Sequence, residues 1–292
     1  MTRLSPAAAA FEGLRVMRRE PKASLAWMVL WLMALAVSAV VIALGEPVVV
    51  SSQAAARSLH QISRQFGSYG FILVSLFLVV WAMTTVATFR AVLAPGQRRA
   101  FYLRLGADEV RLGVMTVSAV GVLLVVGGVP ALLLIALAGP IMRAAPELAR
   151  QIASLGTVIT VGLDVWLGVR LSLIAVETFD ERRFHLSAYW PLARGRFWYL
   201  TASYGICFLI LFALLILFGL AGLALGAAQA AIGLPYGDDL LRRATLLGLA
   251  GLLALLTAGF LVVSTTLFCA CQAYAYREIV KSLPQDSQAP LR

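Results

Sequence analysis

Six long runs of apolar residues, separated by short polar stretches, dominate the pattern of this chain. They cover approximately residues 23–44, 69–93, 112–137, 152–176, 197–226 and 244–276. Each run exceeds the roughly 20 residues that a helix needs to cross the hydrocarbon layer of a membrane. The pattern therefore predicts an all-α polytopic membrane protein with six transmembrane helices in a domain of residues 23–276.

The first apolar run is expected to stay in the protein as a membrane span. It is too long for the apolar part of a signal peptide, and no convincing small-residue cleavage site follows it. Residues 1–22 before it are predicted to form a cytoplasmic amphipathic arm, and residues 277–292 a cytoplasmic tail.

Segments with helical amphipathic spacing lie between the apolar runs. In the amino-terminal arm, Glu12, Arg15 and Arg19 fall on one face of a helix, and Ala10, Leu14 and Met17 fall on another. This spacing predicts a helix that lies on the membrane surface. Similar patterns predict an interfacial helix within residues 51–66, a helical elbow around residues 103–111, and a second elbow within residues 182–197.

The arrangement of amphipathic segment and two spans occurs three times, entering the membrane near Ala23, Leu112 and Phe197. This favours three parallel hairpins, each preceded by a cytoplasmic amphipathic helix. Basic elbows are also common in hairpin membrane proteins that have no internal repeat. Both interpretations stay open.

Composition supports a membrane protein, and the distribution of charge predicts its orientation. Hydrophobic residues make up 61% of the 292 residues and charged residues 13%, far from the usage of soluble domains. The net charge of +10 comes from basic residues at the ends of the apolar runs, which argues against nucleic acid as a partner. Eighteen Lys and Arg residues lie on the side of the two termini and six on the other, so both termini are predicted to be cytoplasmic.

Asp164 and Arg170 are the candidate polar residues inside the membrane. Asp164 is an acidic residue near the middle of the fourth run, where a carboxylate is costly and often functional. A packing role, as a neutral group or bonded to Thr84 or Thr85, is favoured over a transport role. Arg170 is expected to reach the interface or to pair with Glu177.

The elbow before the fifth span carries the candidate lipid-headgroup residues. Arginines stand there beside large aromatic residues, a combination typical of a membrane interface. The residues expected at the headgroup level are Arg182, Arg183, Trp190, Arg194, Arg196 and Trp198. Membrane lipids, anionic lipids among them, are thus the expected partners, although topology alone also explains the charges.

Catalytic and metal-binding patterns are not found in the sequence. His60 and His185 fall on opposite predicted sides of the membrane, and the three cysteines lie in apolar runs, where packing is the favoured role. No phosphate-binding lysine loop or nucleophile motif occurs. We expect no enzyme activity, no catalytic residue, no metal and no cofactor.

The two elbows also suggest a family. The sequences FYLRLGADEVRLGV and RLSLIAVETFDERRFHLSAYWPLARGRFWYL resemble those of bacterial six-span inner-membrane proteins of the YciC-like group. They are similar, too, to the membrane domain that accompanies some glycerophosphodiester phosphodiesterases. The resemblance implies a non-catalytic module of the bacterial inner membrane without the phosphodiesterase barrel.

Two functional hypotheses follow from these patterns. The first is a non-catalytic membrane module that organises envelope lipids or partner proteins, a second copy of itself included. The second is a transporter or channel subunit that uses Asp164 in a polar pathway. A continuous row of polar residues facing Asp164 would favour the second hypothesis, and a dry interior the first.

Overall fold

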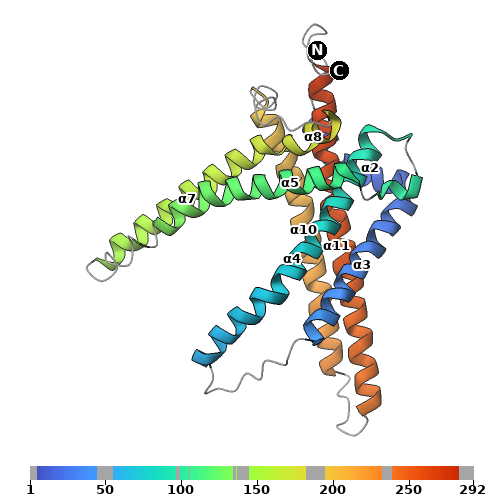
Figure 1. The fold of residues 1–292 in the computed structure, drawn as a ribbon, viewed down its shortest axis with the longest axis vertical. Coiled ribbons are helices and arrows are strands. Elements are labelled where there is room, and N and C mark those ends of the chain that lie inside the picture. Colours follow the sequence, from blue (N-terminus) through green and yellow to red (C-terminus); the bar gives the residue numbers. More distant parts are fainter. Residues whose placement is uncertain are drawn as a thin grey trace. The chain divides into compact units, whose positions relative to one another are not determined.

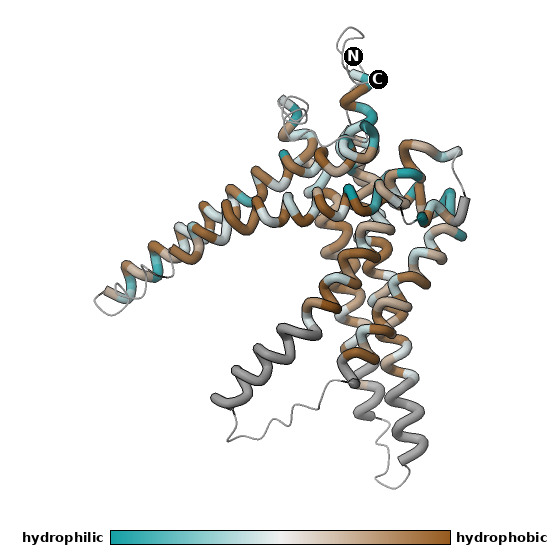
Figure 2. Tube along the Cα trace, in the orientation of Figure 1, coloured by the Kyte–Doolittle hydropathy of each residue, from teal (hydrophilic) through white to brown (hydrophobic). Residues whose placement is uncertain are grey.

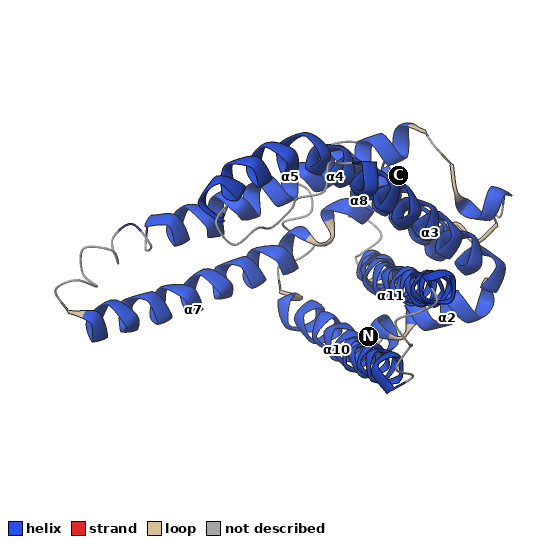
Figure 3. Ribbon diagram, turned by 90° about the horizontal axis from the view of Figure 1, so that it is seen from below, coloured by secondary structure: helices blue, strands red, loops and turns tan. Residues whose placement is uncertain are grey.

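All regular elements in the described part of the chain are helices (Figure 3). The computed structural model describes residues 5–44, 55–96, 99–104, 106–133, 136, 145–181, 195–231 and 239–282. Six of the helical segments in these ranges are long and apolar enough to cross a membrane. The prediction of an all-α, multi-pass membrane protein is confirmed.

The helices are easiest to follow in chain order (Figure 1). Two short helices come first and are followed by the candidate spans and their connecting turns. The described elements are α1 (Pro6–Ala10), α2 (Glu12–Arg19), α3 (Pro21–Leu44), α4 (Ala55–Leu93), η1 (Arg99–Tyr102), α5 (Ala107–Leu123), η2 (Leu124–Gly128), α7 (Pro146–Leu171), α8 (Ile174–Glu181), α10 (Phe197–Ala231) and α11 (Asp239–Lys281).

The chain divides into two compact units. One unit, named the arm unit below, contains residues 10–104 and 204–271, and the other, named the hairpin unit, contains residues 1–9, 105–203 and 272–292. In the arm unit α2, α3, α4 and η1 pack on one another. In the hairpin unit α5, η2 and α7 pack side by side and α8 packs on α5 (Figure 1).

Hydrophobic residues make up much of the long helices (Figure 2), and many of the large ones are exposed. Phe71 is 75% exposed, Leu223 72% and Val158 69%. A soluble protein rarely exposes so many contiguous apolar residues. Lipid chains are the environment in which such surfaces are stable, since the backbone polar groups of each helix are bonded internally.

Two helix boundaries between the spans differ from the sequence-based prediction. Residues 55–93 form one continuous helix, whereas an interfacial helix separate from the second span was expected. The helical elbow expected around residues 103–111 is wrong in its first part, because Gly106 has an extended backbone and α5 begins at Ala107. Glu109 accepts a hydrogen bond from the Gly106 N–H at 3.0 Å, which fixes the start of α5 at this position.

Two span ends also differ. The fourth run was expected to continue unbroken to residue 176, but the helix ends at Leu171 and restarts at Ile174. Ser172 at this break donates its hydroxyl to the carbonyl of Val169 at 2.7 Å, a local bond that competes with the helical ladder. The last helix extends beyond the predicted span to Lys281.

Candidate functional site

The Asp164 carboxyl group lies in the hairpin unit, directly against the backbone of Gly127. Asp164 is near the middle of the candidate span Pro146–Glu181. A methyl group built on Gly127 would overlap the Asp164 carboxyl group, and its carbon would lie 2.7 Å from Asp164 Cγ. The absence of a side chain at position 127 is what allows α7 to place a carboxyl group here.

The backbone that faces Asp164 is an irregular turn of helix. Residues Leu124–Gly128 form a π-helix, with bonds one residue longer than those of an α-helix. Pro130 explains the irregularity, because proline has no N–H and its ring clashes with the carbonyl of the residue four positions earlier, Val126. Position 130 therefore supplies no N–H to the carbonyl of Val126, the residue before Gly127.

One oxygen of the Asp164 carboxyl group has no protein donor in the part of the chain that the structure describes. Its Oδ1 atom is buried and has no hydrogen-bond partner among the described residues. The Thr84 hydroxyl donates instead to the carbonyl of Val80 at 2.9 Å, and Thr85 accepts a weak bond from Cys269 Sγ at 3.5 Å. An unpartnered carboxyl oxygen in this setting is costly and calls for a neutralising group.

Arg170 stacks on an aromatic ring of its own helix. Its guanidinium carbon lies 4.5 Å from the centre of the Trp166 ring, one turn away, in a cation–π contact. The expected pairing with Glu177 is wrong, since neither carboxylate oxygen of Glu177 has a partner among the described residues. The helix break after Leu171 moves α8 off the helical spacing on which that expectation depended.

In the arm unit, helix α2 packs closely against α11. Gly13 of α2 lies so near α11 that a methyl group on it would come within 2.6 Å of Leu267 Cα. Glu12, Gly13 and Val16 are the buried residues of α2. Leu14 and Met17 of the apolar face expected from the sequence are half-buried, and the expectation that this face lies on the membrane surface stays a prediction.

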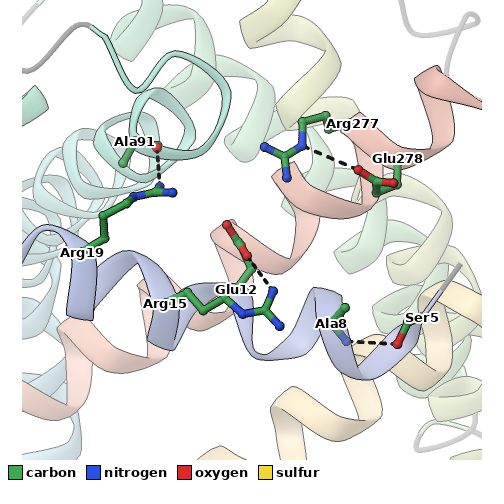
Figure 4. Close-up of polar contacts among 8 residues, drawn as sticks. All are labelled: Ser5, Ala8, Glu12, Arg15, Arg19, Ala91, Arg277 and Glu278. Atoms are coloured by element: carbon green, nitrogen blue, oxygen red, sulfur yellow. Dashed lines mark hydrogen bonds and ion pairs between the residues drawn. The ribbon is translucent and has the colours of Figure 1, made fainter.

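Basic residues flank this buried surface of α2, and Figure 4 shows the polar contacts of two of them, Arg15 and Arg19. Arg15, Arg18 and Arg19 are exposed, and Lys22 follows at the start of α3. Arg15 forms an ion pair with Glu12 at 3.1 Å. Arg19 donates to the carbonyl of Ala91 at the end of α4, at 3.0 Å. These four basic residues were not among those predicted from the sequence to contact lipid headgroups.

A strained turn after α4 is fixed from within the same unit. Phe101 and Tyr102 have positive φ angles of 56° and 65°, which are unfavourable for residues other than glycine. The Phe101 carbonyl accepts a bond from Trp27 Nε1 at 3.1 Å, and the Tyr102 carbonyl accepts one from the buried Arg90 at 3.0 Å. These bonds attach the turn to both α3 and α4 within the arm unit.

Only part of the predicted lipid-headgroup elbow lies in the described residues. Arg182, Arg183, Trp190 and Arg194 lie outside them. Trp198 is 80% exposed, and Phe197 packs edge-on against its ring at 5.4 Å. Arg196 donates to Ser282 Oγ at 2.9 Å, so it connects the start of α10 to the end of α11 within the hairpin unit.

Two further groups of residues lie outside the set predicted as site residues. Glu177 is buried in α8, and its neighbour Asp180 accepts a bond of 3.1 Å from the hydroxyl of Tyr276. Cys207, Cys269 and Cys271 are all buried. In the described ranges no group of three or more His, Cys, Asp and Glu residues is placed to hold a metal ion.

Comparisons with protein-family models, curated proteins and solved structures found no match to this chain.

Proposed function

We propose that the chain is a non-catalytic module of the bacterial inner membrane that binds anionic lipid headgroups at its cytoplasmic end. The resemblance to the YciC-like group is kept as the family hypothesis. The observation that carries the proposal is the position of α2, which contacts α11 through Gly13 and leaves its basic residues exposed.

The basic residues of α2 lie at the end of the arm unit where α3 begins and α4 ends. Lys22 is the second residue of α3, and Arg19 bonds to the carbonyl of Ala91 near the end of α4. A helix start and a helix end of two successive spans lie on the same side of a membrane. The count of basic residues favours the cytoplasmic side for this end.

Charge and geometry together favour lipid phosphate as the partner. The bacterial inner leaflet is anionic, and each basic residue near such a surface contributes about 1 kcal/mol of attraction. The contact between α2 and α11 pre-orders the helix, so less entropy is lost on binding than for a disordered basic arm. Phe11, the residue just before α2, is 43% exposed and adds an apolar side chain to the arm.

The transporter hypothesis is supported less well. The carboxyl group of Asp164 lies against the backbone of Gly127 in η2. No donor among the described residues bonds to the buried Oδ1 atom of Asp164. That arrangement matches a dry helix contact, whereas a transport pathway needs a series of polar groups.

The test compares the lipids that co-purify with three forms of the full chain. Arg15→Gln/Arg18→Gln removes two exposed charges, and Arg15→Lys/Arg18→Lys keeps both charges as the matched control. Two charges at about 1 kcal/mol each correspond to a loss of up to about 30-fold in anionic preference. We expect the ratio of anionic to zwitterionic lipid to fall in the Gln form alone. An unchanged ratio in the Gln form would refute the proposal.

A further inference from the structure

We propose that Glu177 of α8 binds a proton in the folded protein and makes the docking of α8 on α5 sensitive to pH. This inference goes beyond the proposed lipid-binding function, since neither the proton nor α8 belongs to the basic arm. It depends on three features of the hairpin unit. They are a buried carboxyl group, the absence of a donor to it among the described residues, and a second acidic side chain one turn away.

The side chain of Glu177 lies inside the protein. The residue is 3% exposed, and its neighbours Val176 and Thr178 are buried as well. Both carboxyl oxygens of Glu177 are buried and have no hydrogen-bond partner among the described residues. The ionised form would lose its hydration and gain no bond in return, so burial favours the neutral, protonated form.

The other acidic residues of α8 add to this effect. Glu181 follows Glu177 by four positions, one helical turn, and its Oε1 atom is also buried without a partner among the described residues. Two negative charges at this spacing repel one another, and a proton on one of them removes the repulsion. Asp180 is exposed and accepts the hydroxyl of Tyr276 at 3.1 Å, so the donor from α11 is already used.

The charged groups of α5 and α7 have partners other than Glu177. On α5, which packs on α8, Arg111 pairs with Asp108 at 3.3 Å, and Glu109 accepts a hydrogen bond from the start of its own helix. On α7, Arg170 stacks on an aromatic ring of that helix.

The charged groups of α11 near Tyr276 also have partners of their own. The Arg277 guanidinium lies 5.1 Å from the centre of the Tyr274 ring, and its Nε atom lies 3.8 Å from Glu278. Glu278 pairs in addition with Lys281 at 2.9 Å. No basic group of the described residues donates to Glu177. A proton is the neutralising ligand that needs no further space in the packed interior.

The proton is coupled to the packing of α8. Ile174, three positions before Glu177, packs against Met115 of α5. An ionised Glu177 is hydrated only when α8 moves away from α5 and exposes the carboxylate to water. The eight residues of α8 follow the helix break after Leu171, so this movement leaves the helical bonds of α7 in place.

The experiment follows thermal unfolding of the purified full chain in detergent from about pH 5.5 to about pH 8.5, where an exposed glutamate is already ionised. The folded protein keeps a proton that the unfolded chain has released, so the stability should fall as the pH rises. Glu177→Gln, which keeps the shape without the charge, should match the parent at the acidic end. Above the pH at which Glu177 ionises, its Tm should exceed that of the parent by about 2–4 °C more for each pH unit.

Two further variants make the test specific. Glu147→Gln in α7 removes an exposed carboxylate that pairs with Arg150, and it should keep the pH dependence of the parent. Glu181→Gln removes the repelling charge, so Glu177 should ionise, and the Tm should begin to fall, at a lower pH than in the parent. This variant tests the proposal even if Glu177→Gln does not fold. A constant Tm difference between Glu177→Gln and the parent at every pH would overturn the proposal. An unchanged pH dependence in Glu181→Gln would overturn it as well.

Discussion

Gly13→Ala should release the amino-terminal arm from α11. The new methyl carbon would lie 2.6 Å from Leu267 Cα, 2.9 Å from Thr266 O and 3.0 Å from Leu267 N. All three are backbone atoms of α11, so no side-chain rotation can relieve the overlap. Either α2 moves away from α11 or the contact stays strained.

The magnitude follows from two opposing effects. Replacing a helical glycine with alanine stabilises an open position by about 0.5–1 kcal/mol. Overpacking a close contact costs about 1–3 kcal/mol. We therefore expect Gly13→Ala to lower the free energy of unfolding by about 1–2 kcal/mol. Gly205→Ala in α10, which meets no atom within 4 Å, should raise it by about 0.5–1 kcal/mol.

Thermal unfolding in detergent and thiol labelling together provide the assay. Cys207 is buried, and its Sγ lies 3.9 Å from the carbonyl of Ala10, the last residue of α1, two positions before α2 begins. Release of the arm should increase the labelling of Cys207 in Gly13→Ala, read by peptide mass spectrometry, with buried Cys269 as the internal reference. If Gly13→Ala is as stable as Gly205→Ala and Cys207 stays protected, the account of the arm contact is wrong.

Three further expectations concern orientation, the strained turn and the elbow. A cysteine at Glu147 should react with an impermeant thiol reagent added outside the cell, and one at Arg18 should not; the reverse labelling would invert the topology. Trp27→Phe removes the donor to the Phe101 carbonyl and should lower the free energy of unfolding by about 0.5–1.5 kcal/mol, while an unchanged Tm would show that the bond contributes nothing. Arg196→Gln should lower the share of anionic lipid that co-purifies with the protein, and an unchanged share would reduce this elbow to a topology signal.

The spans could be predicted from the sequence because membrane insertion depends on local composition. A run of about 20 apolar residues has few alternatives to a spanning helix, whatever its neighbours are. The breaks within spans depend on single residues instead. The helix breaks at Ser172 although the apolar pattern continues across this residue. The hydropathy of a residue does not show whether its side chain will bond to a nearby backbone carbonyl, as Ser172 does with Val169.

The polar site could be predicted only in part. Asp164 stands out in the sequence as an acidic residue in an apolar run, but its partner surface depends on which helix packs on α7. Gly127 and Pro130 are a local signal of an irregular helix, but the hydropathy of the run does not reveal it. The contact of Gly13 with α11 joins residues about 250 positions apart and has no local signature.

The anionic-lipid claim is tested most directly by lipid competition at increasing salt. The delipidated parent would be offered phosphatidylglycerol and phosphatidylcholine in equal amounts, and the bound lipids counted by native mass spectrometry. The exposed charges of α2 predict an excess of bound phosphatidylglycerol at low salt that shrinks as the Debye length falls from about 30 Å at 0.01 M to about 10 Å at 0.1 M. Equal binding of the two lipids at every salt concentration would contradict the account.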